Sequence, residues 1–166
     1  MWLAAGLALG LCGCAGYRLG PTSAAIPRGR SIEVNFFQND TLEPPRLAEE
    51  VNRVLRETLQ RDGTYQLNTR GDGDVTVNGV LRNYERNGVT FLARDTLTTA
   101  DYQLVLVAHV TATERATGKV LLDKEVRGKV TIYSTRDLTS AERQALPLLA
   151  ADLAQNTTTL LTEGTW

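Results

Sequence analysis

The 166-residue chain carries 18 basic and 19 acidic side chains, which gives a formal net charge of −1. This balance excludes a protein that binds nucleic acid through an overall basic excess, so any anion binding must come from a local cluster. The length is sufficient for one domain with its own hydrophobic core. A single histidine excludes a histidine-rich metal site, and we expect neither a metal nor a cofactor.

The chain opens with an uncharged apolar run, Trp2 to Leu11, that leads to Cys14. The run is too short to cross a bilayer as a helix and suits the apolar core of a signal peptide. Gly13 places a small residue directly before Cys14, a context that resembles the bacterial lipobox. In that motif the cysteine thiol receives a diacylglycerol before the signal peptide is removed. We therefore predict a signal peptide over residues 1–13 and lipidation of Cys14.

Cys12 is the poorer candidate for lipidation, because the bulky Leu11 would precede it. No Lys or Arg precedes the apolar run, so we expect the natural start of the chain to lie further upstream. The alternative is an apolar N-terminus with two structural cysteines. Under the lipoprotein interpretation Cys12 is discarded and Cys14 is acylated, which leaves no disulfide and no catalytic thiol. Ala15 after the anchor favours the outer membrane, on its periplasmic side.

Residues 15–30 are rich in small side chains and are typical of a tether, so we place the folded domain at residues 31–166. Ser31 to Phe37 alternates apolar and polar residues and predicts a strand that ends in a turn. Helical spacing of apolar residues from Leu47 to Leu59, followed by Gly63, predicts the first helix.

Three strand-like segments follow the first helix. Residues 74–85 alternate, with residues 90–92 as a continuation, and residues 102–113 show the clearest period of two. A turn at Ala116 to Lys119 leads to a strand that runs to about Ser134. Its inner face is expected to carry alternating apolar residues, namely Val120, Leu122, Val126, Val130 and Ile132. These neighbouring strands should pair antiparallel.

The last element is a predicted helix that begins at Thr139. Thr139 and Glu142 have the capping-box spacing, in which each side chain bonds the backbone amide of the other residue. Pro147 lacks an amide hydrogen and should bend this helix or divide it in two. The elements together predict an α+β fold, a two-layer sandwich with two helices on one face of a mostly antiparallel sheet of four to five strands. The other face of the sheet should then be free of helices.

Nearly end to end, the chain resembles the LptE family of lipopolysaccharide-assembly lipoproteins, in its LptE-related bacterial branch. The resemblance rests on an ordered series of segments: Gly13 to Leu19, Phe37 to Pro44, Thr117 to Leu121, Glu142 to Leu148 and Leu161 to Gly164. It implies a non-enzymatic, palmitate-bearing outer-membrane lipoprotein that plugs the LptD barrel and aids lipopolysaccharide transport to the surface. A polar free sheet face suits a barrel interior, which is itself polar.

The resemblance also implies contact with lipopolysaccharide, whose phosphates and carboxylates Lys and Arg would bind. The candidates are Lys119 at the hairpin, and Arg127 and Lys129 on the outward parity of the following strand. Arg82 and Arg86, with Arg94, would extend this basic surface if the preceding strand lies alongside. The alternative is an ordinary solvated face on which these cations alternate with carboxylates.

Two other functions remain open from the sequence. One is a regulatory outer-membrane lipoprotein that activates a peptidoglycan synthase or supports a secretion channel, although the short tether disfavours a long reach. The other is an enzyme, for which His109 is the only possible histidine base. A pocket that holds His109 beside a carboxylate would favour that function, whereas its position within a strand favours a structural role.

Overall fold

The computed structural model describes residues 29–41, 46–92, 95–133 and 137–163, with residues 90–100 described by their backbone alone. It contains two helices and six strands in the following order: β1 (Ser31–Val34), β2 (Gln38–Asn39), α1 (Leu47–Asp62), β3 (Gln66–Asn68), β4 (Val75–Leu92), β5 (Asp95–Glu114), β6 (Val120–Tyr133) and α2 (Leu138–Glu163). Neither helix in this part of the chain has the length and apolarity needed to span a membrane. The signal peptide and the tether up to residue 28 fall outside the described residues.

The strands form one mixed sheet in the order β3-β1-β4-β5-β6, and β2 pairs separately with β4. β4, β5 and β6 pair antiparallel in chain order, as their alternating sequences predict. The short strands β1, β2 and β3 pair parallel with their neighbours. The sheet is therefore mostly antiparallel by length, and one edge of the long part is β6.

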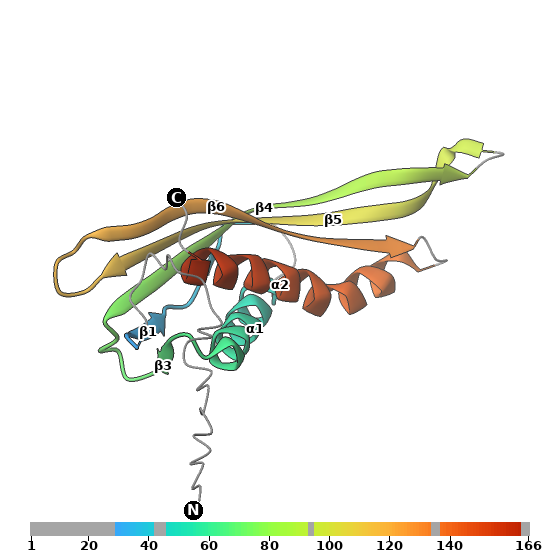
Figure 1. Cartoon of the computed structure of the whole chain (residues 1–166). Helices are drawn as coiled ribbons and strands as arrows, with labels where there is room; N and C mark the ends of the chain where they lie inside the picture. The colour runs from blue at the N-terminus through green and yellow to red at the C-terminus, as the bar shows by residue number, and fades with distance from the viewer. Residues whose placement is uncertain (1–28, 42–45, 93–94, 134–136, 164–166) are drawn as a thin grey trace, which may run out of the picture.

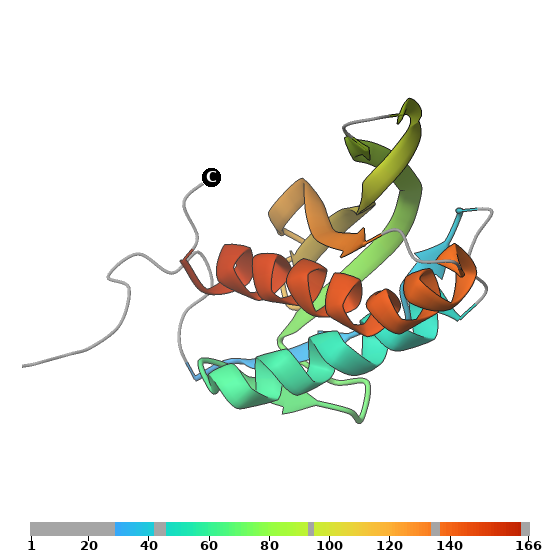
Figure 2. The same cartoon turned by 90° about the vertical axis from the view of Figure 1, so that its right-hand side faces the viewer.

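Both helices lie on one side of the sheet, whereas the opposite face of β4, β5 and β6 carries no helix (Figures 1 and 2). This arrangement confirms the predicted two-layer α+β sandwich. The core lies between the layers and is made of aliphatic and aromatic side chains. Its largest fully buried members are Phe37, Ile32, Leu47, Leu55, Leu59, Leu81, Leu104, Leu106, Leu149, Leu153 and Leu161.

The structure confirms the predicted first helix, α1, and its end at Gly63. Gly63 has a positive φ of 71° and its backbone N–H donates to the carbonyl of Leu59, which closes the last turn in the left-handed conformation that glycine favours. Within α1, Asn52 is buried. Its side chain donates to the carbonyl of Ala48 (2.7 Å) and accepts from the backbone N–H of Phe37 (3.1 Å). Asn52 thereby fixes the chain that follows β1 against the helix.

The capping box predicted for the second helix is wrong. Asp137 caps α2, because its carboxylate accepts from the backbone N–H of Ser140 (3.0 Å) and from the Ser140 hydroxyl. Glu142 lies two residues beyond Ser140, too far into the helix to cap it, and is bound to the sheet instead. α2 continues through Pro147 as one helix, so the predicted division in two is wrong, and the predicted bend at Pro147 stays a prediction.

The three long strands differ from a regular ladder at one position that matters for the surface. Leu81 pairs with Ala108 and Asn83 pairs with Val107, so a β-bulge at Arg82 shifts the side-chain alternation of β4 by one residue. Beyond the bulge, β4 and β5 form a hairpin that projects past the helices (Figure 1). In β6, Val120 is 56% exposed, so its predicted place on the inner face is wrong.

Candidate functional site

The helix-free face of the sheet is the broadest surface that the fold leaves open. We call it the outer face, and the register assigns to it alternate residues of β4, β5 and β6. These are Thr76, Asn78, Val80, Asn83, Glu85, Asn87, Gln103, Val105, Val107, His109, Thr111, Thr113, Asp123, Glu125, Arg127, Lys129 and Thr131. Val105 and Val107 on the central strand are nearly buried by their neighbours. The outer face is thus a polar surface with a narrow apolar centre.

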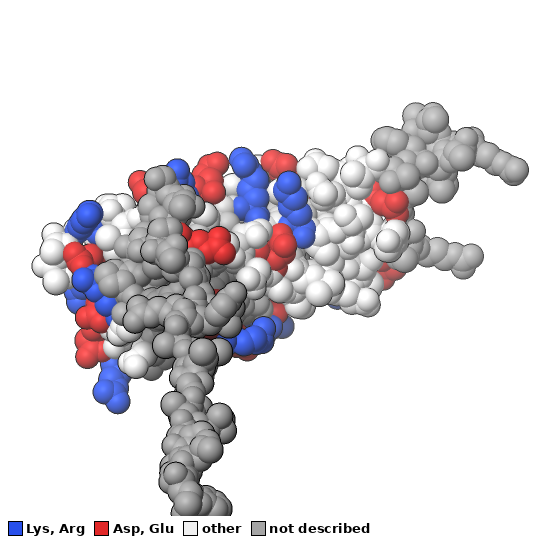
Figure 3. All heavy atoms as spheres, in the orientation of Figure 1, with Lys and Arg blue, Asp and Glu red and all other residues white. Residues whose placement is uncertain are grey.

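Charges of both signs alternate on the β6 part of this face. His109 and Asp123 lie 2.8 Å apart (Nε2 to Oδ1), and Arg127 lies 3.6 Å from Glu125 through their side-chain nitrogen and oxygen atoms. Both carboxylates are more than half exposed, so these contacts are screened by solvent and weak. Figure 3 shows Lys and Arg interspersed with Asp and Glu where β6 lies, and few charges nearer the projecting hairpin.

Three of the predicted basic candidates lie along β6. Arg127 and Lys129 are exposed on the outer face, opposite Val107 and Val105 of β5. Lys119 lies in the turn between β5 and β6, about 30 Å away at the usual rise of a strand. Within the described part of the chain, Lys119 and Lys129 have no carboxylate at ion-pair distance. Arg127 and Lys129 form a pair of neighbouring cations, and Lys119 is separate from them.

Arg82 and Arg86 do not extend this pair. Arg82 lies on the bulge and contacts Asp40, with 3.2 Å between nitrogen and oxygen. Arg86 points to the helix side of the sheet, where it lies 2.7 Å from the carboxylate of Glu142 on α2. The bulge at Arg82 causes this reversal, since it shifts the β4 side chains from Asn83 to Gly88 to the face opposite the one that the sequence alternation predicts. Cys14 and Arg94 fall outside the described residues.

Glu142 is the centre of a polar cluster that the sequence did not reveal. Its carboxylate accepts from the hydroxyl of Tyr84 and from the guanidinium of Arg86, both on the inner side of β4. Tyr84 and Arg86 are two residues apart and so share a face of the strand. The sequence alone does not show that these side chains face α2, because the bulge at Arg82 decides which face of β4 they lie on. The cluster attaches the first turn of α2 to β4.

A second charged group closes the opposite end of the sheet. Asp74 accepts from the backbone N–H (2.8 Å) and hydroxyl (2.9 Å) of Ser31, and these bonds hold the pKa of its carboxyl below the usual 3.8. The hydroxyl of Thr117 and the guanidinium of Arg30 likewise lower the pKa of Glu114. These groups line a cavity of about 300 Å³, but they satisfy one another. They join the starts of β1 and β4 to the turn between β5 and β6, and they are not arranged as a ligand site.

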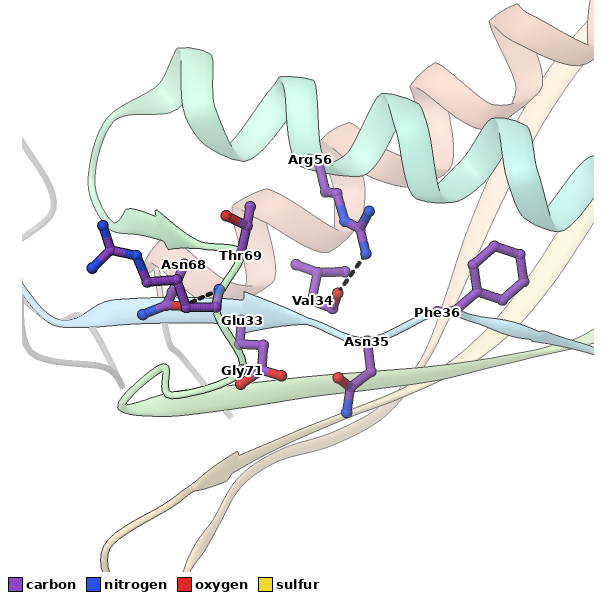
Figure 4. Close-up of a pocket in the computed structure, with 9 residues that line it drawn as sticks. Glu33, Val34, Asn35, Phe36, Arg56, Asn68, Thr69 and Gly71 are labelled. Carbon is purple, nitrogen blue, oxygen red and sulfur yellow. Dashed lines mark hydrogen bonds between the residues drawn. The ribbon is translucent and has the colours of Figure 1, made fainter.

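A cleft of about 350 Å³ lies between α1, β1 and the segment after β3. Figure 4 shows Arg56 reaching from α1 to the carbonyl oxygen of Val34 (2.9 Å), while Glu33 and Asn35 point away from the helix. The carboxylate of Glu33 pairs with Arg115, so it does not neutralise Arg56. A guanidinium at such a cleft can bind a small anionic group. The sequence indicates nothing about this cleft beyond an arginine on a predicted helix.

An apolar groove of about 360 Å³ lies between the end of β6 and the first half of α2. β6 contributes Val130 to Tyr133, and α2 contributes Ala141, Gln144, Ala145 and Leu148. Tyr133 is 74% exposed and Leu148 is 62% exposed, and no lining residue is charged. The sequence places these residues in a strand and a helix but does not show that the two leave a groove between them.

His109 has a carboxylate neighbour but no enclosed site. It pairs with Asp123 on the open outer face, and none of the described cavities is lined by His109. In the part of the chain that the structure describes, no three His, Cys, Asp or Glu side chains are grouped so that they could hold a metal ion. The geometry gives His109 the role of a surface partner of Asp123.

The fold and its surfaces define a class of small two-layer α+β domain that presents an open sheet face (Figure 1). Similar folds occur in a hypothetical protein from Chlamydia trachomatis (TM-score 0.58, 7% identity, 82% of this chain and 97% of that chain) and a protein from Xanthomonas campestris (TM-score 0.55, 12% identity, 89% and 92%). A minor lipoprotein from Acinetobacter baumannii is also similar (TM-score 0.53, 14% identity, 80% and 92%). At these identities the similarity concerns the fold alone.

The comparison with curated protein sequences gave no match. The family model for lipopolysaccharide assembly, LptE, matches residues 29–160, which is nearly the whole folded domain. The chain therefore belongs to the LptE family, as the resemblance in its sequence implies.

Proposed function

We propose that this protein is an outer-membrane lipoprotein that sits in the lumen of an LptD-like barrel and aids the assembly of the barrel and the insertion of lipopolysaccharide. The observation that carries the proposal is the family match over residues 29–160. The outer face adds support from geometry. Its amide, hydroxyl and charged side chains suit the polar interior of a transmembrane barrel, so we assign the barrel contact to this face.

The anchor is part of this proposal. Lipidation of Cys14 would hold the domain at the inner leaflet of the outer membrane, facing the periplasm. The sixteen residues from Ala15 to Arg30 could span roughly 50 Å when extended, which is enough to reach a barrel in the same membrane. This reach is short for a protein that must contact peptidoglycan.

We assign lipopolysaccharide contact to Arg127 and Lys129, the two neighbouring cations of the outer face. Phosphate groups bind guanidinium and ammonium groups through charge-assisted hydrogen bonds. Glu125 lies beside Arg127 and would reduce its attraction for an anion, so Lys129 should contribute more. The proposed role is binding and positioning, without catalysis, cofactor or metal.

The test is co-purification of the tagged full-length lipoprotein from detergent-solubilised outer membranes, with the bound proteins identified by mass spectrometry. We expect an LptD-like barrel in near-equal amount. A charge-reversed control, Arg61→Glu on the exposed side of α1, should recover the same barrel. Recovery of a peptidoglycan synthase or of secretion-channel subunits in place of the barrel would contradict the proposal and support a regulatory role.

A further inference from the structure

The free edge of the sheet at β6 is protected along only part of its length. β5 is the one strand that pairs with β6 in the described sheet. On the other side, the carbonyl of Arg127 accepts from the side-chain amide of Asn156 (2.8 Å), and the N–H of Lys129 donates to the carboxylate of Asp152 (2.8 Å). Two polar side chains of α2 thus cover this stretch of the edge, as natural proteins commonly cover exposed strand edges.

The same alternation continues toward the end of β6. In an antiparallel strand, every second residue directs its N–H and C=O groups away from its partner. Arg127 and Lys129 do so, and therefore Thr131 and Tyr133 do so as well. Among the described side chains, none bonds the backbone groups of these two residues. The edge at Thr131 and Tyr133 thus presents donors and acceptors spaced for another strand.

One stripe of α2 explains why the protection stops. Gln144, Leu148, Asp152 and Asn156 follow one another at helical spacing and face the β6 edge. The second half of the stripe is polar and bonds the edge. The first half, Gln144 and Leu148, is uncharged and lines the groove beside Thr131 and Tyr133 together with Ala141 and Ala145. Among the described residues, the bonds from α2 to the β6 edge come from Asp152 and Asn156, and this uncharged half makes none.

We propose that the end of β6 receives an extended, uncharged segment of the barrel partner as an additional strand. Backbone bonds to Thr131 and Tyr133 would set its register, and its alternate side chains would enter the groove beside Leu148. A partner on the outer face can reach this edge because both surfaces meet at Thr131. The uncharged lining selects an uncharged segment. The inference rests on the proposed function, since it takes the barrel as the source of the strand.

The test is amide hydrogen exchange of the full-length lipoprotein, measured alone and in the complex co-purified with its barrel. Alone, the amides of Thr131 and Tyr133 should exchange rapidly, whereas the amide of Lys129 should be protected by Asp152. In the complex we expect the exchange of Thr131 and Tyr133 to slow by at least about tenfold, which corresponds to roughly 1.4 kcal/mol. Lys129 serves as the internal reference in both samples.

A matched pair of variants tests the groove. Leu148→Glu places a charge in the groove at a side chain that is 62% exposed, and Phe36→Glu makes the same change at one that is 59% exposed between β1 and β2, away from the groove and from the outer face. The first should abolish the slowing at Thr131 and Tyr133, and the second should leave it intact. Both variants should fold, because neither side chain is part of the core.

The outcomes separate the two proposals. A complex that forms with unchanged exchange at Thr131 and Tyr133 overturns the added strand and leaves the barrel partnership standing. If no barrel co-purifies, both proposals fail. If the two amides are already protected in the lipoprotein alone, and this protection rises with concentration, the edge pairs with a second copy of the chain and the proposal is wrong.

Discussion

Asn52 is a buried polar residue that connects α1 with the segment after β1. Its side-chain oxygen accepts a hydrogen bond from the backbone N–H of Phe37, whose aromatic ring is fully buried. Asn52→Ala would leave this donor without a partner, and an unsatisfied buried group costs about 1–3 kcal/mol. We expect the free energy of unfolding to fall by that amount in urea denaturation. Gln60→Ala, on the exposed side of α1, should change it little, and equal stability of the two variants would contradict this role.

Asp137 makes the stability of α2 depend on pH. Hydrogen bonds from the hydroxyl and backbone N–H of Ser140 lower the pKa of its carboxyl below 3.8 in the folded protein. The charged carboxylate therefore stabilises the fold above pH 3.8, and this contribution is lost as the pH falls through the lowered pKa. Asp137→Asn keeps a capping group that does not titrate. Below pH 3.8 the unmodified protein should lose stability relative to the Asp137→Asn variant. A difference in unfolding free energy that stays constant with pH would contradict the assignment.

Arg127 and Lys129 are the residues on which the proposed lipopolysaccharide contact depends. Reversal of both charges with glutamate should weaken binding of purified lipopolysaccharide by about tenfold or more, and the remaining binding should depend less on salt. Surface plasmon resonance of the folded lipoprotein measures this effect. Lys119→Glu tests whether the separate cation at the hairpin shares the site. Equal binding by the double variant and the unmodified protein would contradict the assignment.

At the scale of elements, Gly128 lets α2 approach β6. A Cβ atom there would lie 2.8 Å from the Leu149 carbonyl oxygen and from the Cβ of Leu153. Gly128→Ala should therefore force the helix away from the strand and destabilise the protein by about 1–3 kcal/mol, measured by urea unfolding. Lys124→Ala, at an exposed position of the same strand, is the control. An unchanged unfolding midpoint for the alanine variant at Gly128 would contradict close packing.

The strands and helices could be predicted from the sequence because their apolar spacing was regular. The period of two in residues 102–113 and the helical spacing after Leu47 appear as β5 and α1. The bulge at Arg82 could not be predicted, since no glycine or proline marks it, and it placed Arg86 on the opposite face from the one expected. The cap of α2 was missed for a related reason. Asp137 and Thr139 both precede an apolar run, and only the tertiary contact of Glu142 with β4 decides between them.

At the scale of the whole molecule, the chain presents three different surfaces on one scaffold. The outer face is polar with mixed charge, the groove beside β6 is uncharged, and the cleft at Arg56 holds a guanidinium that no carboxylate in the described part of the chain pairs with. The sequence predicted a helix-free face but neither the groove nor the cleft. Both hollows form where elements from distant parts of the chain meet. A domain that binds its partners through open surfaces does not require an enclosed binding pocket.

The central claim is that the outer face contacts an outer-membrane barrel, and site-specific photocrosslinking in cells tests it most directly. A photoreactive amino acid would replace Thr111 or Glu125 on the outer face and, as controls, Glu57 or Gln60 on the exposed side of α1. We predict stronger crosslinks to an LptD-like barrel from both outer-face positions than from either α1 position. Barrel crosslinks from α1 alone, or none from the outer face, would contradict the account.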